Sequence, residues 1–265
     1  MGGGAAAPNR RIPVPIRVRV TVAGSGDAFG SGGRLQTCVH VQPLGQEEAV
    51  LLDCGASALT SLKRFGLEPN DVTVVAVSHL HGDHFGGLPY LLLDGQFRHR
   101  DRPLHLIGPP GLQQRLEEAM EVLFPDSTRV RRRFATHVHE LASGATLDVE
   151  QVTVQAFGVD HAAGAPALGL RLRVAGRVIA YSGDTAWTDT LIELADNADL
   201  LVCEAYTATR RIRYHLDLPT LRANLQRLRC TRLLLTHPSP DLLAHRAELE
   251  PDLALAEDGT VVELD

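Results

Sequence analysis

The sequence is poor in the features that mark secreted, membrane-bound or nucleic-acid-coating proteins. Four cysteines are scattered among 265 residues without a Cys-x-x-Cys pair, which argues against a disulfide framework or a cysteine-based zinc knuckle. No run approaches the ~18 apolar residues of a membrane span. Residues 1–8 lack the basic segment and apolar core of a secretion signal. We therefore expect an unexported cytoplasmic protein with reduced thiols and no membrane partner.

Excess positive charge is also missing. The formal net charge is -6 and the sequence pI is near 6.0, which argues against a protein that binds nucleic acid indiscriminately through phosphates. Apolar residues make up 44% of the chain and charged residues 22%, as in ordinary globular enzymes. Residues 1–13 have low complexity and predict an unstructured leader, and residues 14–265, in which no linker is visible, predict a single domain.

One stretch concentrates metal-binding side chains. The apolar, β-branched run at 71–77 predicts a buried strand, and Ser78-His79-Leu80-His81-Gly82-Asp83-His84 follows it directly. In extended backbone His79 and His81 point to the same side, and Gly82 lets the chain turn so that Asp83 and His84 can serve a second ion. The pattern predicts a dinuclear metal site. A solvated histidine-rich loop is the alternative.

Further polar residues end other predicted strands. Asp184, Glu204 and His237 each follow an apolar run, and His161 begins a loop between two strands, which is where layered α/β folds carry their sites. Asp53 also ends a strand. It either accepts an N–H from a metal-binding histidine or caps the helix that follows near residue 58.

Alternating and periodic apolar patterns predict strands and helices in two similar halves. Strands are expected at 16–22, 37–41, 49–53, 71–77, 104–107, 151–157, 168–174, 177–181, 200–203 and 232–235. Helices are expected at 58–65, 88–93, 111–124, 188–196, 218–228 and 239–249.

The motif His79-x-His81-x-Asp83-His84 resembles the signature of the metallo-β-lactamase superfamily of hydrolases, and the resemblance extends from about Val20 to Glu248. It implies an α/β fold, a four-layer αββα sandwich with two similar mixed β-sheet halves. It also implies two divalent ions that share a bridging hydroxide as nucleophile, Zn²⁺ first and Mn²⁺ or Fe²⁺ as alternatives. One ion would be held by His79, His81 and His161, and the other by Asp83, His84 and His237, with Asp184 bridging both.

Tyr214-His215-Leu216-Asp217 and Leu235-Thr236-His237-Pro238-Ser239 resemble segments of the ribonuclease Z-like branch, in which a further histidine acts as general acid. The resemblance implies that His215 protonates the departing oxygen and that Glu204 orients it. Asp83 counts among the catalytic residues as well as the ligands. One of three arginines would clamp the substrate phosphate: Arg210, Arg211 and Arg213. An exposed histidine at a loop–helix boundary is the alternative for His215.

One departure bears on the substrate. Only 22 residues separate His161 from Asp184, whereas tRNA-processing members of the branch insert a long basic arm there. The compact layout favours a phosphodiesterase of small or cyclic phosphodiesters over an enzyme with tRNA as partner, and a homodimer is the assembly common in the branch. The alternatives are a hydrolase of carboxylic esters, lactones or thioesters, a tRNA 3′-processing endonuclease, and a non-catalytic metal-binding protein.

The other histidines are interpreted as structural. His137 and His139 alternate like a ligand pair but lack the accompanying Asp-His, so we expect them outside the site. Four further histidines have no partner nearby in sequence: His40, His99, His105 and His245. The basic runs at 129–133 and 210–213 are either solvated or in contact with substrate, and both interpretations stay open.

Overall fold

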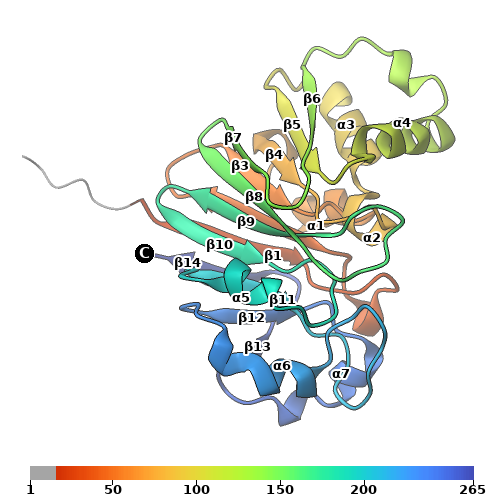
Figure 1. Ribbon diagram of the computed structural model, residues 1–265. Helices are drawn as coiled ribbons and strands as arrows, with labels where there is room; N and C mark the ends of the chain where they lie inside the picture. The colour runs from red at the N-terminus through yellow and green to blue at the C-terminus, as the bar shows by residue number, and fades with distance from the viewer. Residues whose placement is uncertain (1–15) are drawn as a thin grey trace, which may run out of the picture.

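Two β-sheets of seven strands lie face to face, with helices on their outer surfaces (Figure 1). The computed structural model describes residues 16–265, so the expected leader at 1–13 lies outside the described residues. Each sheet contains both parallel and antiparallel strand pairs. The predicted sandwich of two mixed sheets is confirmed.

The first sheet has the strand order β14-β1-β2-β3-β4-β5-β6. Its strands span Val18–Gly24 (β1), Cys38–Pro43 (β2), Ala49–Leu52 (β3), Val72–Ala76 (β4), Leu104–Gly108 (β5), Thr136–Glu140 (β6) and Thr260–Leu264 (β14).

The second sheet has the order β13-β12-β11-β10-β9-β8-β7. Its strands span Thr146–Val149 (β7), Val152–Gly158 (β8), Leu168–Val174 (β9), Arg177–Tyr181 (β10), Leu200–Glu204 (β11), Leu233–Thr236 (β12) and Ala254–Leu255 (β13).

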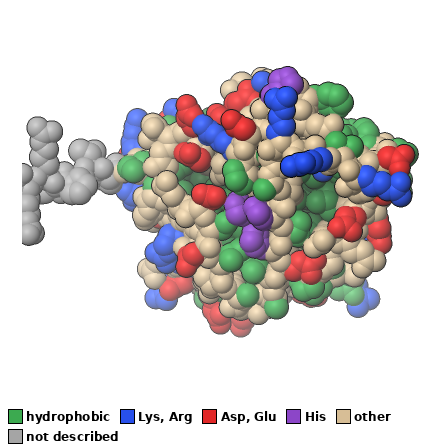
Figure 2. Space-filling view, turned by 90° about the horizontal axis from the view of Figure 1, so that it is seen from above, with side chains coloured by type: hydrophobic (Ala, Val, Ile, Leu, Met, Phe, Trp, Pro, Cys, Tyr) green, Lys and Arg blue, Asp and Glu red, His purple; other side chains and the backbone are tan. Residues whose placement is uncertain are grey.

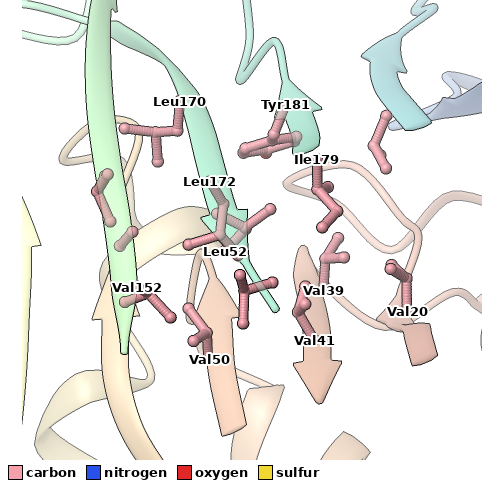
Figure 3. Packing of buried hydrophobic residues seen from close by; sticks show 14 of the residues in the cluster. Val20, Val39, Val41, Val50, Leu52, Val152, Leu170, Leu172, Ile179 and Tyr181 are labelled. Carbon is pink, nitrogen blue, oxygen red and sulfur yellow. The ribbon is translucent and has the colours of Figure 1, made fainter. Parts of the chain in front are cut away.

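The largest apolar core fills the space between the sheets. Successive side chains of a strand point to opposite faces, so Val74 and Ala76 of β4 join this core while Val75 packs toward the helices. Leu170, Leu172 and other residues of the second sheet meet it from the opposite side (Figure 3). A strand buried on both faces needs a nearly continuous apolar run, which 72–76 supplies with Thr73 as its one polar residue.

Two further apolar clusters fix the outer helices. On the first sheet these are Ala58–Arg64 (α1), Leu88–Phe97 (α3) and Leu112–Leu123 (α4), with the single turn Gly82–Phe85 (α2) beside them. On the second sheet they are Thr190–Ala195 (α5), Leu218–Asn224 (α6) and Pro240–Ala244 (α7). Asp217 caps α6 by accepting a 2.8 Å hydrogen bond from the N–H of Thr220, and Pro240 opens α7.

The predicted secondary structure is wrong near the end of the chain. The strand expected at 232–235, observed as β12, was expected to be the final core strand, but β13 and β14 follow it, and β14 returns to pair antiparallel with β1 in the first sheet. The last helix was expected to reach about 249, yet α7 ends at Ala244 and a short 3₁₀ turn follows at 246–248. Strand β7 was also missed.

Within residues 16–265 no helix is long and apolar enough to cross a membrane. A single domain over 14–265 stays a prediction. The core shared by the two sheets supports it.

Candidate active site

The residues that the sequence singled out gather at one edge of the sandwich. Strands β10, β11 and β12 are parallel neighbours, so their carboxyl ends bring Asp184, Glu204 and His237 together. The loop after β4 carries His79 to His84 and ends in α2, which lies with α7 at the right-hand side of Figure 1. His161 joins them from the segment between β8 and β9.

Three histidines form a first group. The Nδ1 atom of His81 lies 3.2 Å from Nε2 of His79 and 3.1 Å from Nε2 of His161. Two nitrogens bound to one tetrahedral zinc at ~2.0–2.1 Å stand about 3.3 Å apart, so the three ring nitrogens have the spacing of a shared metal ion.

Four buried residues form a second group. The Nε2 atom of His84 lies 3.1 Å from Oδ2 of Asp83 and 3.3 Å from Oδ1 of Asp184. On the far side of Asp184, its Oδ2 lies 3.3 Å from Nε2 of His237. Asp184 also clusters with His161 of the first group, so it lies where the two groups adjoin.

The donor set fits a divalent cation. Nε2 of His84 and Oδ1 of Asp184 are buried and have no hydrogen-bond partner among the described residues, which is costly unless a cation is bound. Burial disfavours a charged Asp184, but the neighbouring His237 and His84 lower the pKa of its carboxyl well below the usual value. An anionic, oxygen- and nitrogen-rich pocket of this kind suits Zn²⁺, Mn²⁺ or Fe²⁺.

The other ring nitrogen of four of these histidines is held by a neighbour. Such contacts fix the ring orientation and the tautomer that faces a metal. The contacts are His84 Nδ1 to Asp53 Oδ2 at 2.6 Å, His79 Nδ1 to Ser78 Oγ at 3.0 Å, His161 Nδ1 to the Tyr214 carbonyl at 2.9 Å and His237 Nδ1 to Thr37 Oγ1 at 3.3 Å.

Asp53 orients His84 and does not cap the following helix, whose N-cap is Ser57. Its carboxylate also accepts hydrogen bonds from the N–H and hydroxyl of Ser78, both at 2.7 Å, and from the Tyr181 hydroxyl at 2.7 Å. Asp53 has a φ of 59°, a left-handed conformation that Asp tolerates better than most residues.

His215 lies beside the two groups of possible metal ligands described above, which we call the metal-type groups. The other partner of its ring is Glu204. Its Nδ1–H donates to Oε1 of Glu204 at 2.5 Å, and Glu204 also accepts the N–H groups of Thr185 and Leu216. Burial opposes protonation of His215, yet the hydrogen bond and charge of Glu204 outweigh it and raise the pKa of the ring. With Nδ1 engaged, Nε2 carries the second proton of the charged ring. His215 also lies close enough to His161 and Asp184 to be a metal ligand, which is the competing interpretation.

Beside His215 an open groove holds two of the three expected arginines. Arg211 is exposed and its Nε lies 3.6 Å from Asp217, and the guanidinium of Arg213 lies 4.5 Å from the centre of the Tyr214 ring. Arg210 does not line the groove. In the run at 129–133, by contrast, Arg129 pairs with Asp126 at 3.2 Å and Arg132 bonds the Ser127 carbonyl at 2.9 Å, both local contacts.

Sequence reasoning missed several residues of the site. Tyr181 ends an ordinary apolar strand, and Tyr206 stacks on the His215 ring with centroids 4.5 Å apart. Trp187 lines the groove. None belongs to a motif, and only their position at or soon after the end of a predicted strand could have drawn attention to them. His137 and His139 lie on β6 and contribute to neither metal-type group, as expected.

Comparison with known proteins gives consistent matches over nearly the whole chain. A family model described as "Anti-Pycsar protein Apyc1" matches residues 18–261. Ribonuclease Z of Anoxybacillus flavithermus is 28% identical over 299 aligned residues, which cover 89% of this chain and 94% of that protein. The human tRNase Z short form superposes with a TM-score of 0.75 at 29% identity, covering 92% of this chain and 98% of that one. A diphosphatase of the PhnP family shares the fold, with a TM-score of 0.74 at 21% identity over 94% of this chain and 98% of that one.

Proposed function

The chain belongs to the family of the anti-Pycsar protein Apyc1, within the ribonuclease Z-like branch of the metallo-β-lactamase superfamily, and we propose that this metal-dependent hydrolase cleaves small or cyclic phosphodiesters. The observation that carries the proposal is the 2.5 Å contact between His215 and Glu204 beside the metal-type groups. An alkoxide is a poor leaving group, and a positioned acid helps most when such a group departs.

Each residue of the site has a distinct task in this proposal. Seven residues hold two cations: His79, His81, Asp83, His84, His161, Asp184 and His237. Two such cations, when bound, supply an activated water nucleophile and offset charge on the phosphate. His215 then delivers the proton at its Nε2 to the departing oxygen, and Glu204 stabilises the protonated ring and holds it in place. Zn²⁺ is our first choice because most donors are imidazoles, with Mn²⁺ or Fe²⁺ as alternatives.

The short chain segment between His161 and Asp184 supports a small substrate. The interval between His161 and Asp184 contains β9 and β10, joined by a tight turn at Gly176, and no inserted arm. The alignment with ribonuclease Z spans 299 positions although this chain has 265 residues, so that relative carries segments missing here. The groove beside His215 offers arginines and Trp187 for the rest of a nucleotide-sized substrate.

A second candidate, an RNA-processing endonuclease, is favoured by the names of the relatives, ribonuclease Z and tRNase Z. The short interval and the net charge of -6 weigh against a large polyanionic substrate. We also propose a homodimer in the cytoplasm, which sedimentation analysis and cell fractionation test.

The experiment compares four substrate classes with protein loaded with Zn²⁺ or Mn²⁺: bis-p-nitrophenyl phosphate, a cyclic nucleotide panel, a tRNA precursor with a 3′ trailer, and a set of lactones and thioesters. We expect turnover of the first two classes, and none by Asp184→Asn as a matched control. Cleavage of the precursor alone would establish the endonuclease. Hydrolysis of lactones or thioesters without any phosphodiester turnover would replace the proposal with an ester hydrolase.

A further inference from the structure

A second group of histidines lies outside the candidate active site, on β5 and β6. His105 pairs with Val74 of β4, five residues before His79, so the group lies toward the other end of these parallel strands. His105 of β5 pairs in register with His137 of β6, and Ile107 pairs with His139. Residues two apart on a strand share a face, and Ile107 belongs to the core between the sheets, so the three histidines lie on the inner face of the first sheet. Figure 2 looks onto this end of the sandwich and shows histidine side chains at the surface among scattered acidic and basic ones.

Two of these rings have the spacing of metal ligands. The Nδ1 atom of His105 lies 3.1 Å from Nε2 of His139, which equals the closest nitrogen spacing in the histidine group of the candidate active site. The ring of His137 stacks on His105 with centroids 4.9 Å apart and an interplanar angle of 25°. His137 is exposed, so its ring can turn to add a third nitrogen without disturbing the core.

A carboxylate from the other sheet orients the central ring. Oε1 of Glu150 lies 3.2 Å from Nε2 of His105, on the side of the ring away from His139. This repeats the relationship of Asp53 to His84, in which a carboxylate holds one nitrogen of an imidazole and leaves the other for a cation.

The backbone at Glu150 is strained. It lies in the turn between β7 and β8 with a φ of 50°, a left-handed conformation that favours Gly, Asn or Asp over Glu. The carboxylate that contacts His105 thus comes from a residue whose backbone conformation is costly for Glu, which points to a use for that contact.

We propose that His105 Nδ1 and His139 Nε2 bind one divalent transition-metal ion of the zinc, nickel or copper class, completed by His137 and water, with Glu150 as the residue that orients His105. The ion joins the β5–β6 edge of the first sheet to the β7–β8 turn of the second. It is separate from the proposed catalytic ions, so it links the two sheets whatever reaction the enzyme performs.

The test measures zinc bound per folded chain by equilibrium dialysis and elemental analysis of wild type, His105→Ala and His139→Ala, with His99→Ala as an exposed histidine outside the group. Both cluster variants are expected to hold one ion fewer than wild type, and His99→Ala the same number. The loss is counted relative to wild type, so the result does not depend on what the active site holds or does. Equal zinc in wild type and both variants would overturn the proposal and leave a hydrogen-bonded imidazole pair.

Glu150→Gln and His137→Ala guard against poor folding of the first two variants, because they change an exposed turn and an exposed ring. Each is expected to weaken binding of this one ion, Glu150→Gln by about 10- to 100-fold, as loss of an orienting partner does. Cu²⁺ added to the zinc-loaded protein gives a second readout, an imidazole-bound electron paramagnetic resonance signal that His139→Ala should lack. An unchanged affinity and signal in all of these variants would also reject the site.

Discussion

The hydroxyl of Tyr181, at the end of β10, donates a 2.7 Å hydrogen bond to the Asp53 carboxylate, which follows β3 in the other sheet. The contact therefore crosses the sandwich. The same carboxylate also contacts the ring of His84, with Oδ2 2.6 Å from Nδ1. Both partners are fully buried. The position of a metal-type ligand thus depends on how the two sheets pack.

Tyr181→Phe removes that donor without changing the shape of the side chain. A hydrogen bond to a charged group contributes about 1.5–3 kcal/mol, so we expect the free energy of unfolding to fall by about 2 kcal/mol. Urea unfolding of metal-free protein measures it. Tyr90→Phe, which alters a partly exposed ring on α3, is the control and should change little. Equal effects of the two substitutions would show that the contact with Asp53 contributes nothing.

Asp53→Asn tests whether the carboxylate tunes His84. Asn tolerates the left-handed backbone at this position, so the fold should survive, while the anion that orients the imidazole is lost. We expect affinity for the ion held by His84 to fall about 10- to 100-fold. Competition with a chelator measures this, and unchanged affinity in a folded variant would leave Asp53 with a purely structural role.

His215→Ala should keep the bound metal and lose activity selectively. A general acid contributes typically 10²- to 10⁴-fold, and the loss should be large for substrates with alkoxide leaving groups and small for those that release p-nitrophenolate. Glu204→Gln should show the same selectivity to a smaller degree, because it acts through His215. Loss of metal along with activity in His215→Ala would identify the ring as a ligand instead.

Arg213→Ala tests the groove beside His215. If the guanidinium contacts the substrate, the substitution should raise KM several-fold, with a smaller effect on kcat. Arg131→Ala, in the exposed run before β6, is the matched control and should leave both constants unchanged. The opposite pattern would move substrate contact to the run at 129–133.

His40 makes the protein sensitive to acid. Its side chain is 2% exposed, and burial lowers the pKa of the imidazole to about 4. The unfolded chain takes up this proton near pH 6.5, so the contribution to stability is complete above that pH and is lost as the pH falls toward 4. By pH 5 the loss is about 2 kcal/mol. Urea unfolding in a chelator should show His40→Gln losing that much less stability than wild type between pH 7 and 5, whereas parallel curves would contradict the assignment.

The scaffold was predictable where local pattern and burial agree. The run at 72–76 is apolar except at Thr73, because both of its faces are covered. Pro240 opens α7 because its fixed φ suits a first helical turn. The edge strands β7, β13 and β14 were harder to recognise. They are short or partly exposed, so their sequences carry little of the alternation that marks a strand.

The sequence by itself determined which chemistry the chain can perform. Ligand type is a property of the side chain, and spacings such as that of His79 to His84 are set by a few backbone dihedrals, so the motif and its metal class are local information. The tertiary structure decided which distant residues meet: Tyr181 with Asp53, His215 with Glu204, and His105 with His139 and Glu150. His105 had been interpreted as a histidine without a partner, because its neighbours come from another strand and another sheet. Pairing across strands and sheets is fixed by register and core packing, which depend on the whole chain at once.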